Sequence, residues 1–234
     1  MTVTEMDTLL KRLLGDPNGY RWGHEQRREA LNMAQREVVN AILGMSVNGR
    51  PPFDLLLSIQ AQSTISLDSD GYALSGLDSS PGPFIGEQGF VRARATPDTD
   101  ACDLIHVRPE SGEGGDNYFL QGYAAHPFIR FEGGKVYAEY GSTAALSADF
   151  VYIRTPKTMV TDGATGYQVA TCELNVSLHD LVVRMAEAYC RRMANDFEQY
   201  KLIRQETMQS LTDMVRSSAT SPTVGDLSTI AGGE

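Results

Sequence analysis

The sequence predicts an α+β protein in which N- and C-terminal amphipathic helices pack as a small bundle, with a β-rich insert between them. Apolar residues recur at three- and four-residue steps near both ends, which is the helical period. The middle alternates short β-branched and aromatic runs with Gly, Pro, Asp and Ser. The 234 residues are 41% hydrophobic, enough apolar material for one domain that carries an insert. The expected segments are N-terminal helices at 1–48, the insert at 49–165, a C-terminal long helix or helices at 166–216 and a flexible tail at 217–234.

Two helices are expected in the N-terminal segment, over residues 4–14 and 24–43. Thr4 is the expected cap of the first, and a strong turn signal, Asp-Pro-Asn-Gly, follows it. Trp22, the single tryptophan, stands just before the second helix, where it is expected to anchor the core. The apolar face of the second helix is formed by Ala30, Leu31, Ala34, Val38, Ala41 and Ile42.

The insert is expected to consist of short strands separated by loops at 75–88 and 109–117. Its clearest signal is a hairpin, because two apolar runs flank a tight Glu132-Gly133-Gly134 turn. The expected strands are Leu55–Leu67, Gly89–Ala95, Leu104–Arg108, Tyr118–Gln121, Phe128–Phe131, Val136–Tyr140 and Phe150–Arg154.

Helix is expected again over residues 177–216, with Ser177 as its cap. No Gly or Pro lies between Gly166 and Pro222, so an unbroken helix would be a rod on the order of 60 Å long. Because this exceeds the diameter of a small domain, we expect either a break near Asn195-Asp196 or a helix that projects toward a partner.

The net charge gives little reason to expect nucleic-acid binding, and the cysteines and histidines give little reason to expect catalysis. The net charge is −10 at pH 7, whereas phosphate binding needs clustered Lys and Arg. Cys102, Cys172 and Cys190 are too scattered for a disulfide framework or a zinc site, and are expected to be reduced. The four histidines lack metal-ligand spacing, and no phosphate loop or nucleophile elbow is present. We therefore expect no enzyme, no cofactor and no metal.

The two ends of the chain carry a more specific pattern. Tyr20-Arg21-Trp22 precedes a helix that contains Leu31-Asn32-Met33-Ala34-Gln35-Arg36-Glu37-Val38. Later, Asp149-Phe150-Val151-Tyr152-Ile153-Arg154-Thr155-Pro156-Lys157 is followed by Cys172-Glu173-Leu174 and a helix that opens Leu178-His179-Asp180-Leu181-Val182. In order and spacing these segments resemble the head-to-tail adaptor (connector) proteins of tailed bacteriophages. The resemblance covers the two ends and leaves the insert from 50 to 148 unmatched.

The resemblance implies a structural virion protein that forms a ring below the portal, commonly a dodecamer. Such a ring connects the capsid to the tail and continues the DNA channel. Its partners would be further copies of itself, the portal protein, a tail or nozzle protein, and genome DNA that passes through the lumen without sequence-specific binding. The location would be the head-tail junction of the virion, after assembly in the host bacterial cytoplasm. No apolar run approaches the roughly 20 residues that span a bilayer, so no membrane partner is expected.

Two sets of residues are candidates for the contacts of such a ring. The first would lie between subunits, as exposed positive side chains at a strand corner and on the last helix: Arg154, Lys157, Arg191 and Arg192. The second would reach the portal from the end of the last helix and the tail: Met214, Val215, Val224, Leu227 and Ile230.

Three other functions remain open from the sequence. One is another virion part, such as a tail-completion or nozzle-interface protein, because helical ends with a β insert also suit that role. Another is a virion-associated hydrolase, whose only candidate catalytic residues in the sequence are His106, His126 and nearby acids. The last is a cytoplasmic binding module unrelated to phage.

Overall fold

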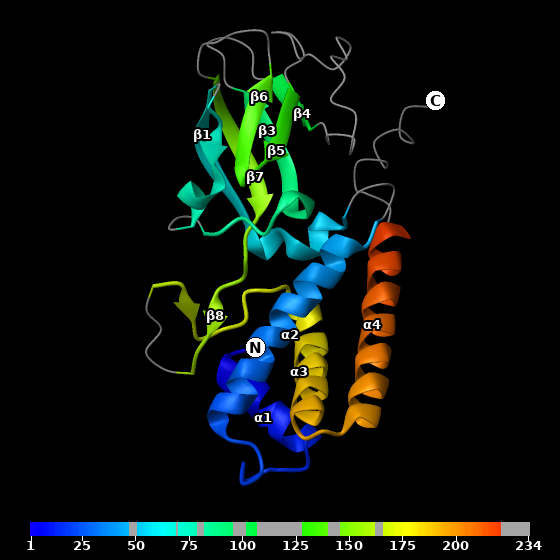
Figure 1. The fold of residues 1–234 in the computed structure, drawn as a ribbon. Helices are drawn as coiled ribbons and strands as arrows, with labels where there is room; N and C mark the ends of the chain where they lie inside the picture. Colours follow the sequence, from blue (N-terminus) through cyan, green and yellow to red (C-terminus); the bar gives the residue numbers. More distant parts are fainter. Residues whose placement is uncertain are drawn as a thin grey trace, which may run out of the picture. The chain divides into compact units, whose positions relative to one another are not determined.

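The chain contains both helices and sheets, which confirms the mixed α+β class (Figure 1). The computed structural model describes residues 1–46, 51–68, 70–78, 82–95, 102–106, 128–139, 146–161 and 166–220. Contacts divide the chain into two compact units. The helical unit comprises Met1–Ser58 and Pro156–Glu234, and the strand unit comprises Ile59–Thr155.

Among its described residues the helical unit has the α-helices α1 (Val3–Leu13), α2 (His24–Gly44), α3 (His179–Met193) and α4 (Phe197–Thr220). Helix α3 packs against each of the others. The unit also contains the short turns η1 (Phe53–Ile59) and η5 (Val176–Leu178) and a parallel pair of strands, β8 (Thr158–Met159) and β9 (Gln168–Val169). Segments from the two ends of the sequence therefore form one core.

The helix starts differ from the sequence expectation. Thr2, not Thr4, caps α1: its hydroxyl accepts from the Glu5 amide at 3.2 Å, and the Glu5 carboxylate accepts from the Thr2 amide at 2.8 Å. This reciprocal capping box satisfies two amides, and only Thr2 has a glutamate three residues on. Ser177 is not a cap either, because Asn175 caps η5 and α3 follows it directly.

A buried ion pair and an aspartate-centred loop fix α1 to α2. The Arg27 guanidinium donates from Nε to Asp7 Oδ1 at 2.6 Å and from Nη2 to Asp7 Oδ2 at 3.1 Å, and it also bonds to the Trp22 carbonyl. The amides of Tyr20, Arg21 and Trp22 donate to the Asp16 carboxylate. Trp22 is buried, as expected of a core anchor.

Helix α2 also holds the segment that follows the strand unit. The Asn32 side chain donates to the Met159 carbonyl at 3.0 Å and accepts from the Met159 amide at 2.7 Å. Gln35 donates to the Lys157 carbonyl at 3.4 Å. The Asn32 side chain therefore adds two hydrogen bonds to the backbone of β8, which pairs with β9.

The strand unit is a seven-stranded sheet with the order β1-β7-β3-β4-β5-β6-β2. Every pairing is antiparallel except that of β4 with β5. The outer strands β1 and β2 also contact each other, so the sheet curls around its core. The strands are β1 (Gln60–Leu67), β2 (Tyr72–Ala73), β3 (Phe90–Ala95), β4 (Cys102–His106), β5 (Phe128–Glu132), β6 (Lys135–Glu139) and β7 (Leu146–Ile153), with the turns η2 (Leu74–Leu77) and η3 (Glu87–Gly89).

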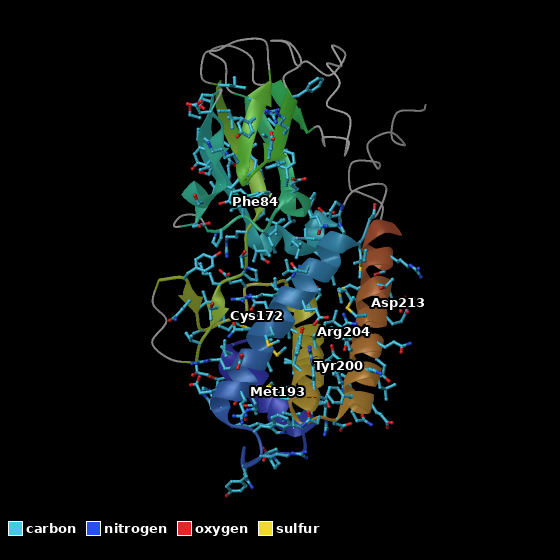
Figure 2. The ribbon with its side chains drawn as sticks, viewed as in Figure 1. Phe84, Cys172, Met193, Tyr200, Arg204 and Asp213 are labelled. Carbon is cyan, nitrogen blue, oxygen red and sulfur yellow. The ribbon has the colours of Figure 1, made fainter. Side chains whose placement is uncertain are left out.

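Aromatic rings fill the inside of the curled sheet. Phe84 contacts Phe131, Phe150 and Tyr152 at centroid distances of 5.6 to 5.7 Å, and Figure 2 labels it in the strand unit. Such contacts add stability beyond the burial of area. The expected hairpin is confirmed: Glu132 pairs with Lys135, and the turn residues Gly133 and Gly134 have φ of 57° and 77°. The strand expected at Tyr118–Gln121 lies outside the described residues.

The unit boundaries at Ile59 and Thr155 lie inside the range 49–165 expected for the insert. The sequence beyond them belongs to the helical unit because η1 and β8 join its core. No helix within the described ranges is both long and apolar enough to cross a membrane.

Candidate interaction surface

Helix α4 is attached to its unit by a narrow stripe. Its buried side chains, among those described, recur every four residues: Ile203, Thr207, Leu211 and Val215. The Thr207 hydroxyl is satisfied by donation to the Ile203 carbonyl at 2.7 Å. By contrast, α3 buries most of its circumference. A helix that buries one stripe leaves a wide face for other contacts.

The turn between α3 and α4 lies where the sequence predicts a break. Asn195 has a φ of 60° and occupies the left-handed position that follows a helix end. The Asn195 amide donates to the Arg192 carbonyl, and the Asp196 amide donates to the Arg191 carbonyl, both at 3.0 Å. The Asp196 carboxylate then accepts from the Gln199 amide at 3.3 Å, at the start of α4. The expected rod is therefore folded into a helical hairpin.

One carboxylate joins α2, α3 and α4. Glu37 Oε1 accepts from Arg204 Nε at 2.8 Å, and Glu37 Oε2 accepts from the Tyr189 hydroxyl. Burial, and then the hydrogen bond to Glu37, raise the pKa of Tyr189 well above its ordinary value, so the phenol keeps its proton. The hydrogen bond to Glu37 also raises the pKa of Arg204. We call Glu37, Tyr189 and Arg204 the three-helix junction.

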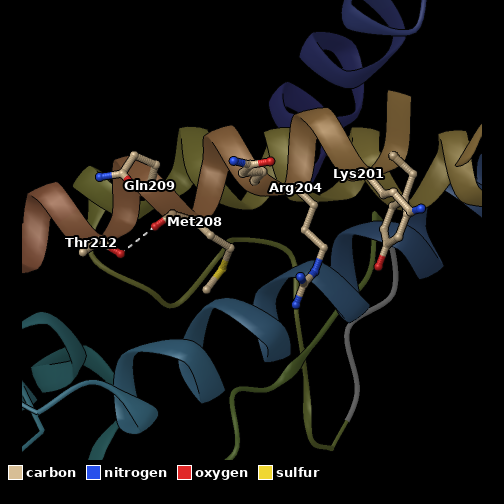
Figure 3. A pocket seen from close by; sticks show the side chains of 7 residues that line it. Lys201, Arg204, Met208, Gln209 and Thr212 are labelled. Atoms are coloured by element: carbon tan, nitrogen blue, oxygen red, sulfur yellow. Dashed lines mark hydrogen bonds between the residues drawn. The ribbon is translucent and has the colours of Figure 1, made fainter. Parts of the chain in front are cut away.

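A groove of about 590 Å³ runs along the same side of α4 (Figure 3). Cationic, amide, thioether and aromatic groups line it: Tyr200, Lys201, Arg204, Gln205, Met208, Gln209 and Thr212. The Thr212 hydroxyl donates to the Met208 carbonyl at 2.9 Å, the contact drawn as a dashed line. A lining of this mixed polar and apolar character suits the docking of a polar chain or helix.

Apolar side chains are also exposed around the helical hairpin. Met193 is 42% exposed and Phe197 is 52% exposed, and the two flank the Asn195 turn. Leu202, further along α4, is 51% exposed. Figure 2 labels Met193 at the end of α3 and Tyr200 and Arg204 along α4. Exposed apolar groups near a polar groove are typical of a protein contact surface.

The candidates for contacts between subunits occupy different environments. Arg154 is buried, its backbone amide donates to the Ile59 carbonyl, and its guanidinium donates to the Thr155 carbonyl at 3.3 Å. Lys157 is half-buried and lies 3.8 Å from Glu173. The strand corner therefore does not present Arg154 to a partner, because the side chain bonds within its own unit.

The candidates on the last helices are more accessible. Arg191 forms an ion pair with the buried Glu187 at 3.7 Å, and Arg192 is exposed and lies over the Tyr200 ring, 5.6 Å from its centroid. Both residues lie near the end of α3, just before the turn of the helical hairpin.

Among the candidates for portal contact, Val215 is buried in the stripe of α4 and is only 3% exposed. Met214, its neighbour, is partly exposed. Helix α4 runs four residues beyond the expected end at 216. Val224, Leu227 and Ile230 lie outside the described residues.

The groups associated with catalysis do not form a site where the structure describes them. No cluster of three His, Cys, Asp or Glu residues there could hold a metal ion. Cys172 and Cys190 are buried free thiols, and burial raises the pKa of Cys190 to about 12. The side chains of His106, His126 and Cys102 lie outside the described part of the chain.

The three-helix junction is the feature that sequence reasoning missed. Glu37 lies in a polar stretch of the second helix, and Tyr189 fits the apolar repeat of the third, so neither stands out. Only the fold back at Asn195 brings Arg204 to them. No protein-family model matches the chain, and no curated protein matches it.

Proposed function

We propose that this chain is a structural subunit of a tailed-bacteriophage virion, which forms a ring below the portal, connects the capsid to the tail and continues the DNA channel. The proposal starts from the resemblance of the two ends of the sequence to head-to-tail adaptor proteins. The segments that carry it are in contact, because Asn32 and Gln35 on α2 bond to the backbone of Met159 and Lys157. This contact supports reading them as one structural arrangement of helix and strand end rather than two unrelated stretches.

In this proposal the helices from both ends form the ring-building bundle, and the strand unit is an insert that faces a neighbouring virion component. The observation that carries the proposal is the incomplete burial of α4. Helix α4 has 24 residues and is attached to its unit by one buried stripe. Its groove and its exposed side chains Phe197 and Leu202 are therefore available for contact with a neighbouring subunit. In a cyclic ring each subunit offers one such surface and receives a different one.

The partners follow from the same proposal. Copies of the chain would form the ring, and the portal protein would contact Met214 and the residues after α4, including Val224, Leu227 and Ile230. A tail or nozzle protein would bind on the opposite side. The net charge of −10 suits a lumen through which DNA slides, because strong phosphate contacts would hold it. The chain would need no cofactor and would perform no bond chemistry, and it would reach the head-tail junction after assembly in the bacterial cytoplasm.

Native mass spectrometry of the chain, alone and mixed with the portal protein of the same virion, tests this proposal. We expect a closed homo-oligomer, alone or on the portal. Leu202→Glu should abolish it, because it places a charge on the exposed face of α4. Met33→Glu is the matched control, since Met33 is 39% exposed on α2 and should tolerate the charge. A chain that stays monomeric beside assembled portal rings would contradict the proposal.

A further inference from the structure

The hairpin of α3 and α4 turns at three residues, Ala194, Asn195 and Asp196, and Asn195 has the least common backbone conformation of the three. Asn195 is the only non-glycine residue in the described ranges with a positive φ. Asparagine tolerates this left-handed conformation better than residues with larger or branched side chains. The sequence on both sides is otherwise compatible with a continuous helix, because no Gly or Pro occurs between Gly166 and Pro222. A change of Ala194, Asn195 and Asp196 to helical angles would join α3 to α4 and carry α4 away from its own core.

The surface of α2 and α3 that α4 covers can equally be covered by the α4 of another copy of the chain. Departure of α4 would remove Arg204 from Glu37 and Tyr189 and would expose the apolar surface under its buried stripe. A second copy of the chain carries the same stripe and the same arginine at the same spacing. It can therefore restore every lost contact without any new complementary surface, which is what makes exchange of identical elements a low-cost route to assembly.

We propose that neighbouring copies exchange α4, so that the helix of one subunit occupies the α2 and α3 surface of the next, and the three-helix junction forms between chains. The short turn, Ala194-Asn195-Asp196, is the hinge, and its length favours exchange over reclosure once it straightens. The inference rests on the proposed ring and adds a contact through the buried stripe of α4 to the contact that the exposed face of the helix makes. Passed from subunit to subunit, the exchange gives a head-to-tail cyclic interface.

Complementation between two charge-reversed chains tests the exchange. In Glu37→Arg two positive groups meet within one chain, and in Arg204→Glu two negative groups meet. Each variant alone should assemble poorly. In an equimolar mixture, exchange places the arginine introduced at position 37 of one chain beside the glutamate introduced at position 204 of the other. The reciprocal contact joins the unchanged Arg204 of the first chain to the unchanged Glu37 of the second. Native mass spectrometry should therefore detect mixed oligomers that contain both masses.

The hinge provides a second test that does not disturb the junction. Asn195→Gly relieves the left-handed position and should reduce the exchanged oligomer several-fold. Asn195→Ala penalises that position and should raise the oligomer by about ten-fold at a given concentration. Shifts in the same direction, or none, would overturn the exchange.

The outcomes separate this inference from the proposed function. Wild-type oligomers together with charge variants that fail to complement each other would overturn the exchange and leave the ring intact. Absence of any wild-type oligomer, alone or with the portal, would overturn both. Mixed oligomers that appear only from the two variants together would support the exchange.

Discussion

The buried pair of Asp7 and Arg27 gives the sharpest prediction about stability. Arg27 is 3% exposed, and two of its nitrogens bond to the Asp7 carboxylate. Asp7→Asn would leave a guanidinium buried without its counter-charge, which typically costs about 3–5 kcal/mol. That is a large share of the roughly 5–15 kcal/mol by which domains are stable. We therefore expect a fall in Tm on the order of 10 °C.

Trp22 supplies the assay, because it is the only tryptophan and its carbonyl accepts from Arg27. Its fluorescence during urea unfolding reports the helical unit alone. Glu25→Gln is the control: Glu25 also pairs with an arginine, Arg28, but its side chain is 74% exposed, so the loss should be at most about 0.5 kcal/mol. A loss below about 1 kcal/mol for Asp7→Asn would refute the reasoning, because buried and exposed pairs would then be equivalent.

The pair also predicts a dependence on pH. Burial raises the pKa of Asp7, but the hydrogen bonds and charge of Arg27 outweigh it and hold the pKa below its ordinary value. The unfolded chain therefore binds the proton more readily, so stability is complete above the unfolded pKa near 3.8 and falls as the pH drops below it. Wild type should lose urea resistance in this range, and Asp7→Asn should lose less.

Two further predictions concern other parts of the fold. His179 is buried, its Nε2 donates to the Leu174 carbonyl at 2.9 Å, and burial lowers its pKa. The resistance of the protein to urea should therefore fall as the pH drops below about 6.5, and His179→Gln should flatten that dependence. If the pH profile of the variant equals that of the wild type, the dependence arises from other groups. Gly134→Ala should destabilise the strand unit by about 1 kcal/mol in thermal unfolding, because its φ is 77°. Gly44→Ala, at a helical position with open space around a Cβ, should be neutral or stabilising, and equal losses in both variants would contradict the argument.

Features governed by local chemistry could be predicted from the sequence. The helical periods, the Gly133-Gly134 turn and the break at Asn195-Asp196 each follow from residues close in sequence, and the structure contains all three. The direction of α4 after the break could not be predicted. It depends on the distant stripe and on Glu37, which local patterns do not relate to Arg204.

The short strand β8 and the arginine proposed for a subunit contact also depend on tertiary contacts that the sequence does not reveal. β8 pairs with β9 and also bonds to the Asn32 amide, a contact across 127 sequence positions that no alternation of side chains signals. Arg154 ends a strand two residues before a proline, which favours an exposed corner, yet its side chain is buried. Sequence patterns indicate which face of an element is apolar, but they do not indicate which polar side chain the tertiary fold will cover.

The proposed function assigns this chain to the virion of a tailed bacteriophage, and a reconstruction of that virion by electron cryomicroscopy tests the central claim most directly. The account predicts that this chain forms a closed ring between portal and tail, with α4 at the contact between neighbouring subunits. Density for the chain elsewhere in the particle, or its absence from the particle, would contradict it.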